Sequence, residues 1–69
     1  MNINLRRIRR QRLLTMRDLA ARSGMTAASI SRIENGQVQP RFSTIRRLAN
    51  ALHVTPEELA GIADEEKQR

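Results

Sequence analysis

The stretch LTMRDLAARSGMTAASISRIENG, residues 14–36, decides the fold. In it a threonine twice follows a hydrophobic residue, at Thr15 and at Thr26, and a second hydrophobic residue lies five positions after the first. A threonine hydroxyl in this setting accepts a hydrogen bond from a first-turn amide, and the apolar pair closes over it. Gly24 and Gly36 follow, and glycine supplies the left-handed conformation that ends a helix.

This pattern predicts two short helices, over residues 16–23 and 27–35, with a tight glycine turn between them. Two short helices joined in this way form a helix-turn-helix arrangement. The same signal recurs at Thr55, which is followed by proline at the first helical position and by Glu58 as a capping-box glutamate. It predicts a further short helix over residues 56–60.

Two more helices are predicted on either side of the central pair. Residues 3–11 place Leu5 and Ile8 on one face, and Leu13 and Leu14 are expected to follow into the core. Residues 42–52 carry one hydrophobic stripe at helical spacing, formed by Phe42, Ile45, Leu48, Ala49 and Leu52.

Alternating strand patterns are absent, and the chain of 69 residues has room for one domain. We therefore predict an all-α, compact five-helix domain over residues 1–61 and a charged tail over residues 62–69. A domain of this size buries little core, so it depends on short loops and capped helices, or on dimerisation.

The charge is unevenly distributed along the chain. Thirteen basic residues against seven acidic ones give a net charge of +6. Up to Pro56, eleven arginines face only two acids, a net of +9, whereas from Glu57 onward five acids face two bases. A basic body of this kind predicts a polyanionic partner. Arginine suits phosphate and guanine because its planar fork donates two hydrogen bonds at once.

Several other classes of protein are disfavoured. The chain has no cysteine and one histidine, His53, so we expect no disulfide and no metal site. It has no apolar run of the roughly 20 residues that a membrane span needs, and its basic start lacks the pattern of a signal peptide. No nucleophile–base pair or glycine-rich phosphate loop is evident. We expect a cytoplasmic protein that is not an enzyme and has no cofactor or small-molecule ligand.

Beyond these signals, the chain carries a set of residues whose combination and spacing are highly specific: Leu19-Ala20, Gly24, Ile30, Ile33-Glu34-Asn35-Gly36, Pro40, Leu48-Ala49, Leu52 and the closing run 54–59, VTPEEL. With these residues, the segment from about Leu5 to Leu59 resembles the XRE family, the Cro and phage-repressor type of helix-turn-helix. The resemblance implies a lambda-repressor-like fold that usually binds double-stranded DNA as a symmetric homodimer. It also implies a structural ion pair between Arg9 and Glu34 and, by analogy, a dimer surface near residues 54–62.

The helix from Thr26 to Asn35 is the predicted recognition helix. Because Ile30 and Ile33 must face the core, the outward positions are Ala27, Ala28, Ser31, Arg32 and Asn35. A helix in the major groove reads bases mainly from its N-terminal half. Base readout is therefore predicted for Thr26, Ala27, Ala28 and Arg32.

The predicted readers differ in chemistry. Arg32 would grip the O6 and N7 atoms of guanine, the alternative being a phosphate contact or a solvated side chain. Ala27 and Ala28 would pack on thymine methyl groups, the alternative being that their small size only lets the backbone approach.

A second set of residues is predicted to contact phosphates: Thr15, Arg17, Ser31, Asn35 and Arg41. Helix N-termini attract phosphate through their free amides. Many family members carry glutamine just after the second helix's cap, where this chain has Met16, so Arg17 is expected to replace that contact. Six further arginines (6, 7, 10, 12, 46 and 47) are expected to supply the long-range field or to lie on solvated faces.

The favoured function is transcriptional regulation, as a repressor that binds an inverted-repeat operator with half-sites about 34 Å apart. The alternative from another class is an antitoxin or a protein-interaction adaptor with the same fold. RNA binding is disfavoured because Phe42, the one aromatic residue, is expected to be buried.

Overall fold

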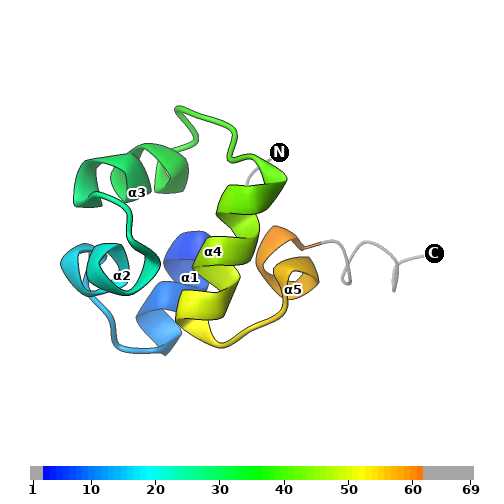
Figure 1. Cartoon of the computed structure of the whole chain (residues 1–69), viewed down its shortest axis with the longest axis horizontal. Coiled ribbons are helices and arrows are strands. Elements are labelled where there is room, and N and C mark those ends of the chain that lie inside the picture. The colour runs from blue at the N-terminus through cyan, green and yellow to red at the C-terminus, as the bar shows by residue number, and fades with distance from the viewer. Residues whose placement is uncertain (1–2, 62–69) are drawn as a thin grey trace.

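The computed structural model describes residues 3–61, and within them the chain forms five helices and no strand (Figure 1). The helices are α1 (Leu5–Gln11), α2 (Met16–Ser23), α3 (Ala27–Glu34), α4 (Phe42–Leu52) and α5 (Pro56–Ala60). The all-α, five-helix prediction is therefore confirmed. The predicted tail, residues 62–69, lies outside the described residues. None of the described helices is long and apolar enough to cross a membrane.

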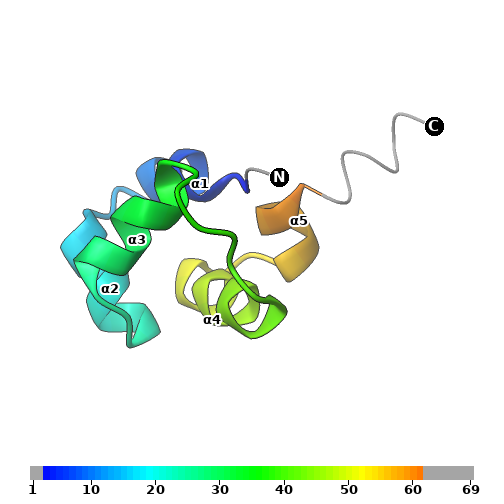
Figure 2. The ribbon, with the colours of Figure 1, turned by 90° about the horizontal axis from the view of Figure 1, so that it is seen from above.

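The helices surround one core. α2 and α3 lie together at one end, α5 lies at the other, and α4 packs between α2 and α5 (Figures 1 and 2). Every helix contributes at least one side chain without solvent exposure: Leu5, Leu19, Ile30, Leu48, Leu52 and Leu59. The α2–α3 pair is thus held in place by α4, which packs against α2, and by α1, which packs against α3.

Three threonines begin three of the helices, as the sequence predicts. The hydroxyls of Thr15, Thr26 and Thr55 each accept a hydrogen bond from the backbone amide three residues on, at 3.0–3.1 Å. The hydrophobic residues that precede them, Leu14, Met25 and Val54, are partly buried against the core. Each cap stabilises the fold by about 1 kcal/mol, which is a large share in a domain of this size.

The capping box is formed at another helix than the one expected. The Asp18 carboxylate accepts the Thr15 backbone N–H at 2.9 Å, so α2 has the complete reciprocal pair. At α5 only the threonine half is formed, and the predicted return bond to Glu58 is absent from the described structure.

Two helix limits also differ from the prediction. α1 begins at Leu5 rather than Ile3, because the Asn4 backbone N–H donates to the Leu59 carbonyl at 2.8 Å and ties the entering chain to α5. α3 ends at Glu34, and Asn35 is its C-cap. Gly36 then turns the chain with a φ of 73°.

Two hydrophobic side chains that were expected in the core are on the surface. Leu13 is 91% exposed and Phe42 is 72% exposed, whereas Leu14 does pack against the core. Leu13 follows Arg12, the C-cap of α1, and has a left-handed φ of 58°, so that only the next residue, Leu14, turns inward. Phe42 is the first residue of α4, whose buried stripe begins one turn later at Ile45.

The conformation of Leu13 predicts that glycine is better tolerated there than leucine. A left-handed φ costs a residue with a Cβ about 1–2 kcal/mol, which glycine does not incur. Glycine also makes the unfolded chain more flexible, and this entropy offsets part of the stabilisation. Leu13→Gly should raise the free energy of unfolding by about 0.5–1 kcal/mol in urea titrations. Leu13→Ala, which keeps the Cβ, should change it little. A loss of stability in Leu13→Gly would show that the leucine side chain is held by packing.

Candidate nucleic-acid interface

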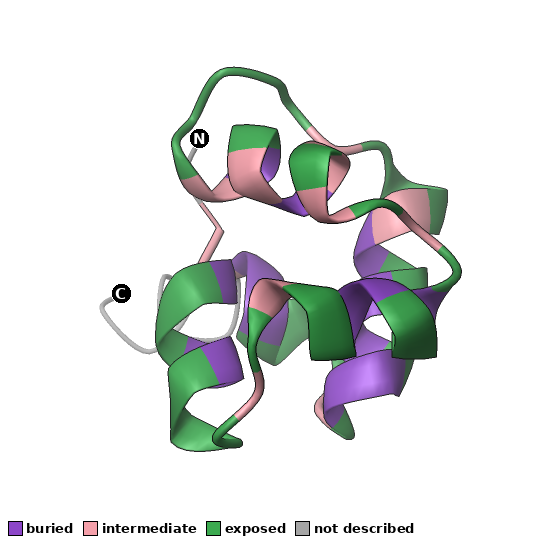
Figure 3. Ribbon diagram, turned by 90° about the vertical axis from the view of Figure 1, so that its left-hand side faces the viewer, coloured by how far each residue is buried: buried purple, intermediate pink, exposed green. Residues whose placement is uncertain are grey.

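The α3 helix has one face in the core and the other on the outside of the molecule. Ile30 and Ile33 anchor α3 in the core, with 0% and 8% exposure. Figure 3 views the molecule from the α2–α3 side, and the loop that follows α3 is exposed over residues 35–39. This side can therefore approach a large, flat or grooved partner without unfolding any helix.

The predicted base readers do not share one environment. Thr26, Ala28 and Arg32 are exposed, and among residues 3–61 the Arg32 guanidinium has no hydrogen-bond partner. Ala27 is half-buried and packs against the core, so the expectation that it faces outward is wrong. The reason is helical spacing, because Ala27 lies three residues before Ile30 on the same face.

The predicted phosphate contacts gather at three helix ends. Thr15 and Arg17 are exposed at the start of α2, and Arg41 is exposed at the N-cap of α4, where it forms no side-chain cap. Ser31 and Asn35 lie one turn apart at the end of α3, and the Asn35 Nδ2 donates to Ser31 Oγ at 3.3 Å.

A buried carboxylate joins α3 to α1. The Glu34 side chain has no exposed surface, and Arg9 Nε donates to its Oε2 at 2.6 Å while Arg9 Nη2 donates to Oε1 at 3.0 Å. Arg9 Nη1 also donates to the Leu14 carbonyl at 2.8 Å, just before the cap of α2. The structure thus brings together the two residues of the implied ion pair and links them to the α1–α2 turn.

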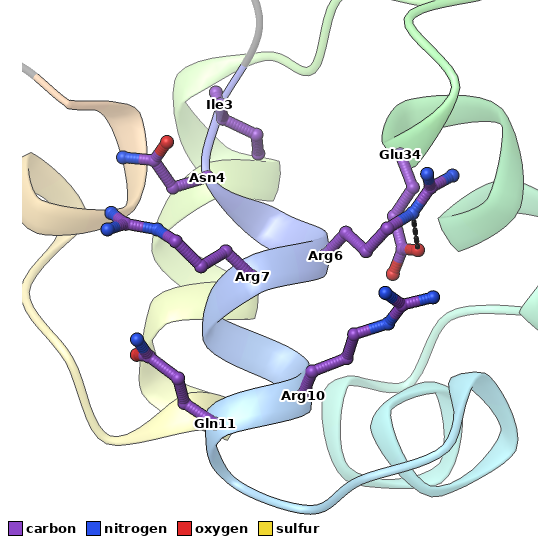
Figure 4. A pocket seen from close by; sticks show the side chains of 7 residues that line it. All are labelled: Ile3, Asn4, Arg6, Arg7, Arg10, Gln11 and Glu34. Carbon is purple, nitrogen blue, oxygen red and sulfur yellow. Dashed lines mark hydrogen bonds and ion pairs between the residues drawn. The ribbon is translucent and has the colours of Figure 1, made fainter.

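A second arginine at this carboxylate was not foreseen in the sequence. Arg6 Nε donates to Glu34 Oε1 at 3.2 Å, and Arg6 Nη2 donates to Asn35 Oδ1 at 2.7 Å. Figure 4 shows Arg6 and Glu34 facing each other beside α1. Arg6 lies three residues before Arg9, so the helical spacing of two arginines was the available signal.

Arg12 also has a structural role that the sequence prediction missed. Its Nε donates to the Leu52 carbonyl at 3.1 Å, which satisfies a backbone acceptor in the last turn of α4. Of the six arginines expected to supply the long-range field or to lie on solvated faces, Arg6 and Arg12 therefore donate hydrogen bonds to other helices.

The arginines change the titration of this carboxylate. Burial by itself would raise the pKa of Glu34, but the hydrogen bonds from Arg9 and Arg6 outweigh it and lower the pKa below the ordinary value of 4.5. The hydrogen bond to Glu34 in turn raises the pKa of Arg9. Hydrogen bonds from Thr15 lower the pKa of Asp18 at the α2 capping box. Glu34 is therefore charged at neutral pH.

The lowered pKa of Glu34 predicts acid sensitivity. Because its folded pKa lies below 4.5, the carboxylate stabilises the fold above that pH, and this contribution is lost as the pH falls through the lowered pKa. Glu34→Gln should lower the free energy of unfolding by about 3 kcal/mol at neutral pH and flatten its decline in acid. Urea titrations between about pH 7 and 3 measure both.

Asp18→Asn is the comparison for this measurement. Asp18 is exposed, and solvent screens its contribution, so the variant should keep most of the decline in acid. If the stability of Glu34→Gln declined in acid as steeply as that of the unsubstituted chain, Glu34 would not be the source of the acid sensitivity.

The chain is similar to known regulators. A family model described as helix-turn-helix matches residues 5–59. The HTH-type transcriptional repressor RghR of Bacillus subtilis (strain 168) is 50% identical over 56 residues, which is 80% of this chain and 42% of the relative. An uncharacterized HTH-type transcriptional regulator of the same organism, RghRB, is 47% identical over 60 residues, 86% of this chain and 43% of the relative.

A third relative is matched over most of its own length. The uncharacterized HTH-type transcriptional regulator y4dJ of Sinorhizobium fredii (strain NBRC 101917 / NGR234) is 39% identical over 62 residues, 90% of this chain and 80% of the relative. The matched segment spans less than half the length of both Bacillus relatives.

Proposed function

Because the chain belongs to the XRE family of helix-turn-helix proteins, we propose that it binds double-stranded DNA as a transcriptional regulator, with α3 in the major groove. The single observation that carries this proposal is the outward face of α3. Thr26, Ala28 and Arg32 are exposed on it, and the Arg32 fork is free of partners among residues 3–61. A helix of eight residues in this position fits the groove and reads base edges.

The electrostatics support the same partner. The eleven arginines before Pro56 outnumber the acids, and the Glu34 carboxylate is already neutralised by Arg6 and Arg9. The start of α2 adds Thr15 and Arg17, which we propose as phosphate contacts together with Ser31, Asn35 and Arg41. DNA binding should therefore weaken steeply as salt rises, because several arginines displace counterions.

Repression by a homodimer is the finer form of the proposal. RghR, one of the relatives, is named as a transcriptional repressor. We propose an inverted-repeat operator with half-sites about 34 Å apart, as is usual for dimeric helix-turn-helix proteins. The dimer surface would lie near residues 54–62, of which Ile62 is outside the described residues.

The exposure of Phe42 changes the case for RNA. Phe42 is exposed although the sequence predicts it to be buried, so burial of the aromatic ring no longer disfavours single-stranded RNA. Recognition of single strands uses aromatic side chains on which successive bases stack. One aromatic residue in the whole chain cannot provide such a surface, so double-stranded DNA remains the better partner.

Selection of bound sites from random double-stranded DNA at physiological salt tests the proposal. Enrichment of one inverted repeat is the expected result. Equal retention of all sequences, or stronger competition by single-stranded RNA than by the selected duplex, would overturn it.

Arg32→Ala separates base readout from charge. Loss of a bidentate contact to guanine should weaken binding to the selected site by about 1–3 kcal/mol, with a smaller loss on random DNA. Arg46→Ala removes the same charge from an exposed position on α4 and should affect both DNAs equally. Fluorescence anisotropy measures the affinities of the two variants and of the unsubstituted chain for both DNAs. If Arg32→Ala lost the same affinity for both DNAs, Arg32 would contact only phosphate.

A further inference from the structure

The side-chain amide of Asn35 is held at both ends. Its Oδ1 accepts from Arg6 Nη2 at 2.7 Å, and its Nδ2 donates to Ser31 Oγ at 3.3 Å. A side-chain amide has one accepting and one donating end, which a half-turn exchanges. Arginine only donates. Arg6 therefore fixes the carbonyl of Asn35 toward α1 and its NH₂ group toward the edge of α3.

This orientation decides what the end of α3 offers to a ligand. The Ser31 oxygen accepts from Asn35, and within residues 3–61 the Ser31 hydroxyl proton has no acceptor. The second Asn35 N–H is also uncommitted in that part of the chain. Phosphate oxygens only accept hydrogen bonds, so an edge of donors suits a DNA backbone, and a rotated Asn35 would present its carbonyl oxygen instead.

Arg6 is itself placed by the buried carboxylate. Its Nε bond to Glu34 Oε1 and its Nη2 bond to Asn35 Oδ1 use one planar fork on the last residue of α3 and its C-cap. Glu34 keeps both of its bonds to Arg9 if Arg6 is removed, so the buried charge stays paired. Figure 4 shows Arg7 on the other side of α1 from Arg6 and Glu34. Arg7 is therefore a matched control for the loss of one charge.

We propose that Arg6 is a positioning residue for DNA binding: through Asn35 it sets Asn35 and Ser31 as hydrogen-bond donors toward a DNA phosphate at the end of α3. This inference rests on the proposed function and assigns to Arg6 a role that acts through its neighbours. A lysine cannot replace it, since a single ammonium group lacks the fork that reaches both Glu34 and Asn35.

A double-mutant cycle on the selected duplex tests the coupling. For each variant that lacks Arg6, the loss caused by the charge alone is divided out with the value measured for Arg7→Ala. Arg6→Ala so corrected and Asn35→Ala should each weaken binding about fivefold, and the double variant, corrected in the same way, should be no weaker than either. Effects that multiply, or an Arg6→Ala affinity equal to that of Arg7→Ala, would overturn the proposal. Thermal unfolding of each variant establishes that it is folded at the assay temperature.

Two further measurements separate positioning from direct contact. The salt dependence of Arg6→Ala should match that of Arg7→Ala, whereas a lost phosphate contact would reduce the slope by about a further 0.9. Arg6→Lys keeps the charge and loses the fork, so it should bind as weakly as Arg6→Ala does after correction for the charge loss of Arg7→Ala. Full affinity in Arg6→Lys would show that only the charge matters, and the further reduced slope would show that Arg6 itself contacts a phosphate. Either result would overturn the proposal.

The cycle also distinguishes failure of this inference from failure of the proposed function. If the unsubstituted chain prefers no duplex over random DNA, the proposed function fails and the inference falls with it. If the chain binds its selected site while Arg6 and Asn35 act independently, only the positioning role is wrong.

Discussion

The Glu34 carboxylate, buried between α1 and α3, is the interaction on which the arrangement of the helices depends. A charge without exposed surface is tolerated only when it is paired and hydrogen-bonded, and Arg9 supplies two such bonds from α1. The same guanidinium holds the Leu14 carbonyl, so one side chain fixes the end of α3 and the start of α2 relative to α1. The two helices of the helix-turn-helix are thereby oriented by a third.

This constraint matters because the apolar core is small. Among residues 3–61, seven apolar residues are without exposure, and none of the described helices is longer than eleven residues. Directional contacts therefore carry much of the specification of the fold: the threonine caps set where α2, α3 and α5 begin, and Arg12 satisfies a carbonyl at the end of α4. The result is a short α3 whose inner face is anchored in the core. On its outer face, the Arg32 guanidinium has no hydrogen-bond partner among residues 3–61.

The sequence predicts the helices well because caps and stops are local signals. Thr15, Thr26 and Thr55 begin helices where their hydroxyls can reach an amide three residues on, and this depends only on neighbouring residues. Leu13 and Phe42 were misplaced for the opposite reason. Hydrophobicity indicates a preference for the core, but the left-handed turn at Leu13 and the position of Phe42 at a helix start decide where the side chain goes.

The candidate site was predictable to a lesser degree. The pairing of Arg9 with Glu34 came from family resemblance, and spacing alone could not select one of the chain's twelve arginines. The bond from Arg6 to Asn35 joins residues 29 positions apart, so only the packing of α1 on α3 reveals it. Ala27 was placed outward because it lies one turn before Ser31, although its spacing of three residues from Ile30 also places it beside the core.

We propose that α3, held by the pairing of Glu34 with Arg9 and Arg6, is the surface that meets DNA. Amide chemical-shift mapping during titration of the chain with its selected duplex tests this most directly. The account predicts that the largest changes fall at residues 26–35 and at the start of α2. Changes confined to the end of α4 and to α5, with residues 26–35 unaffected, would contradict it.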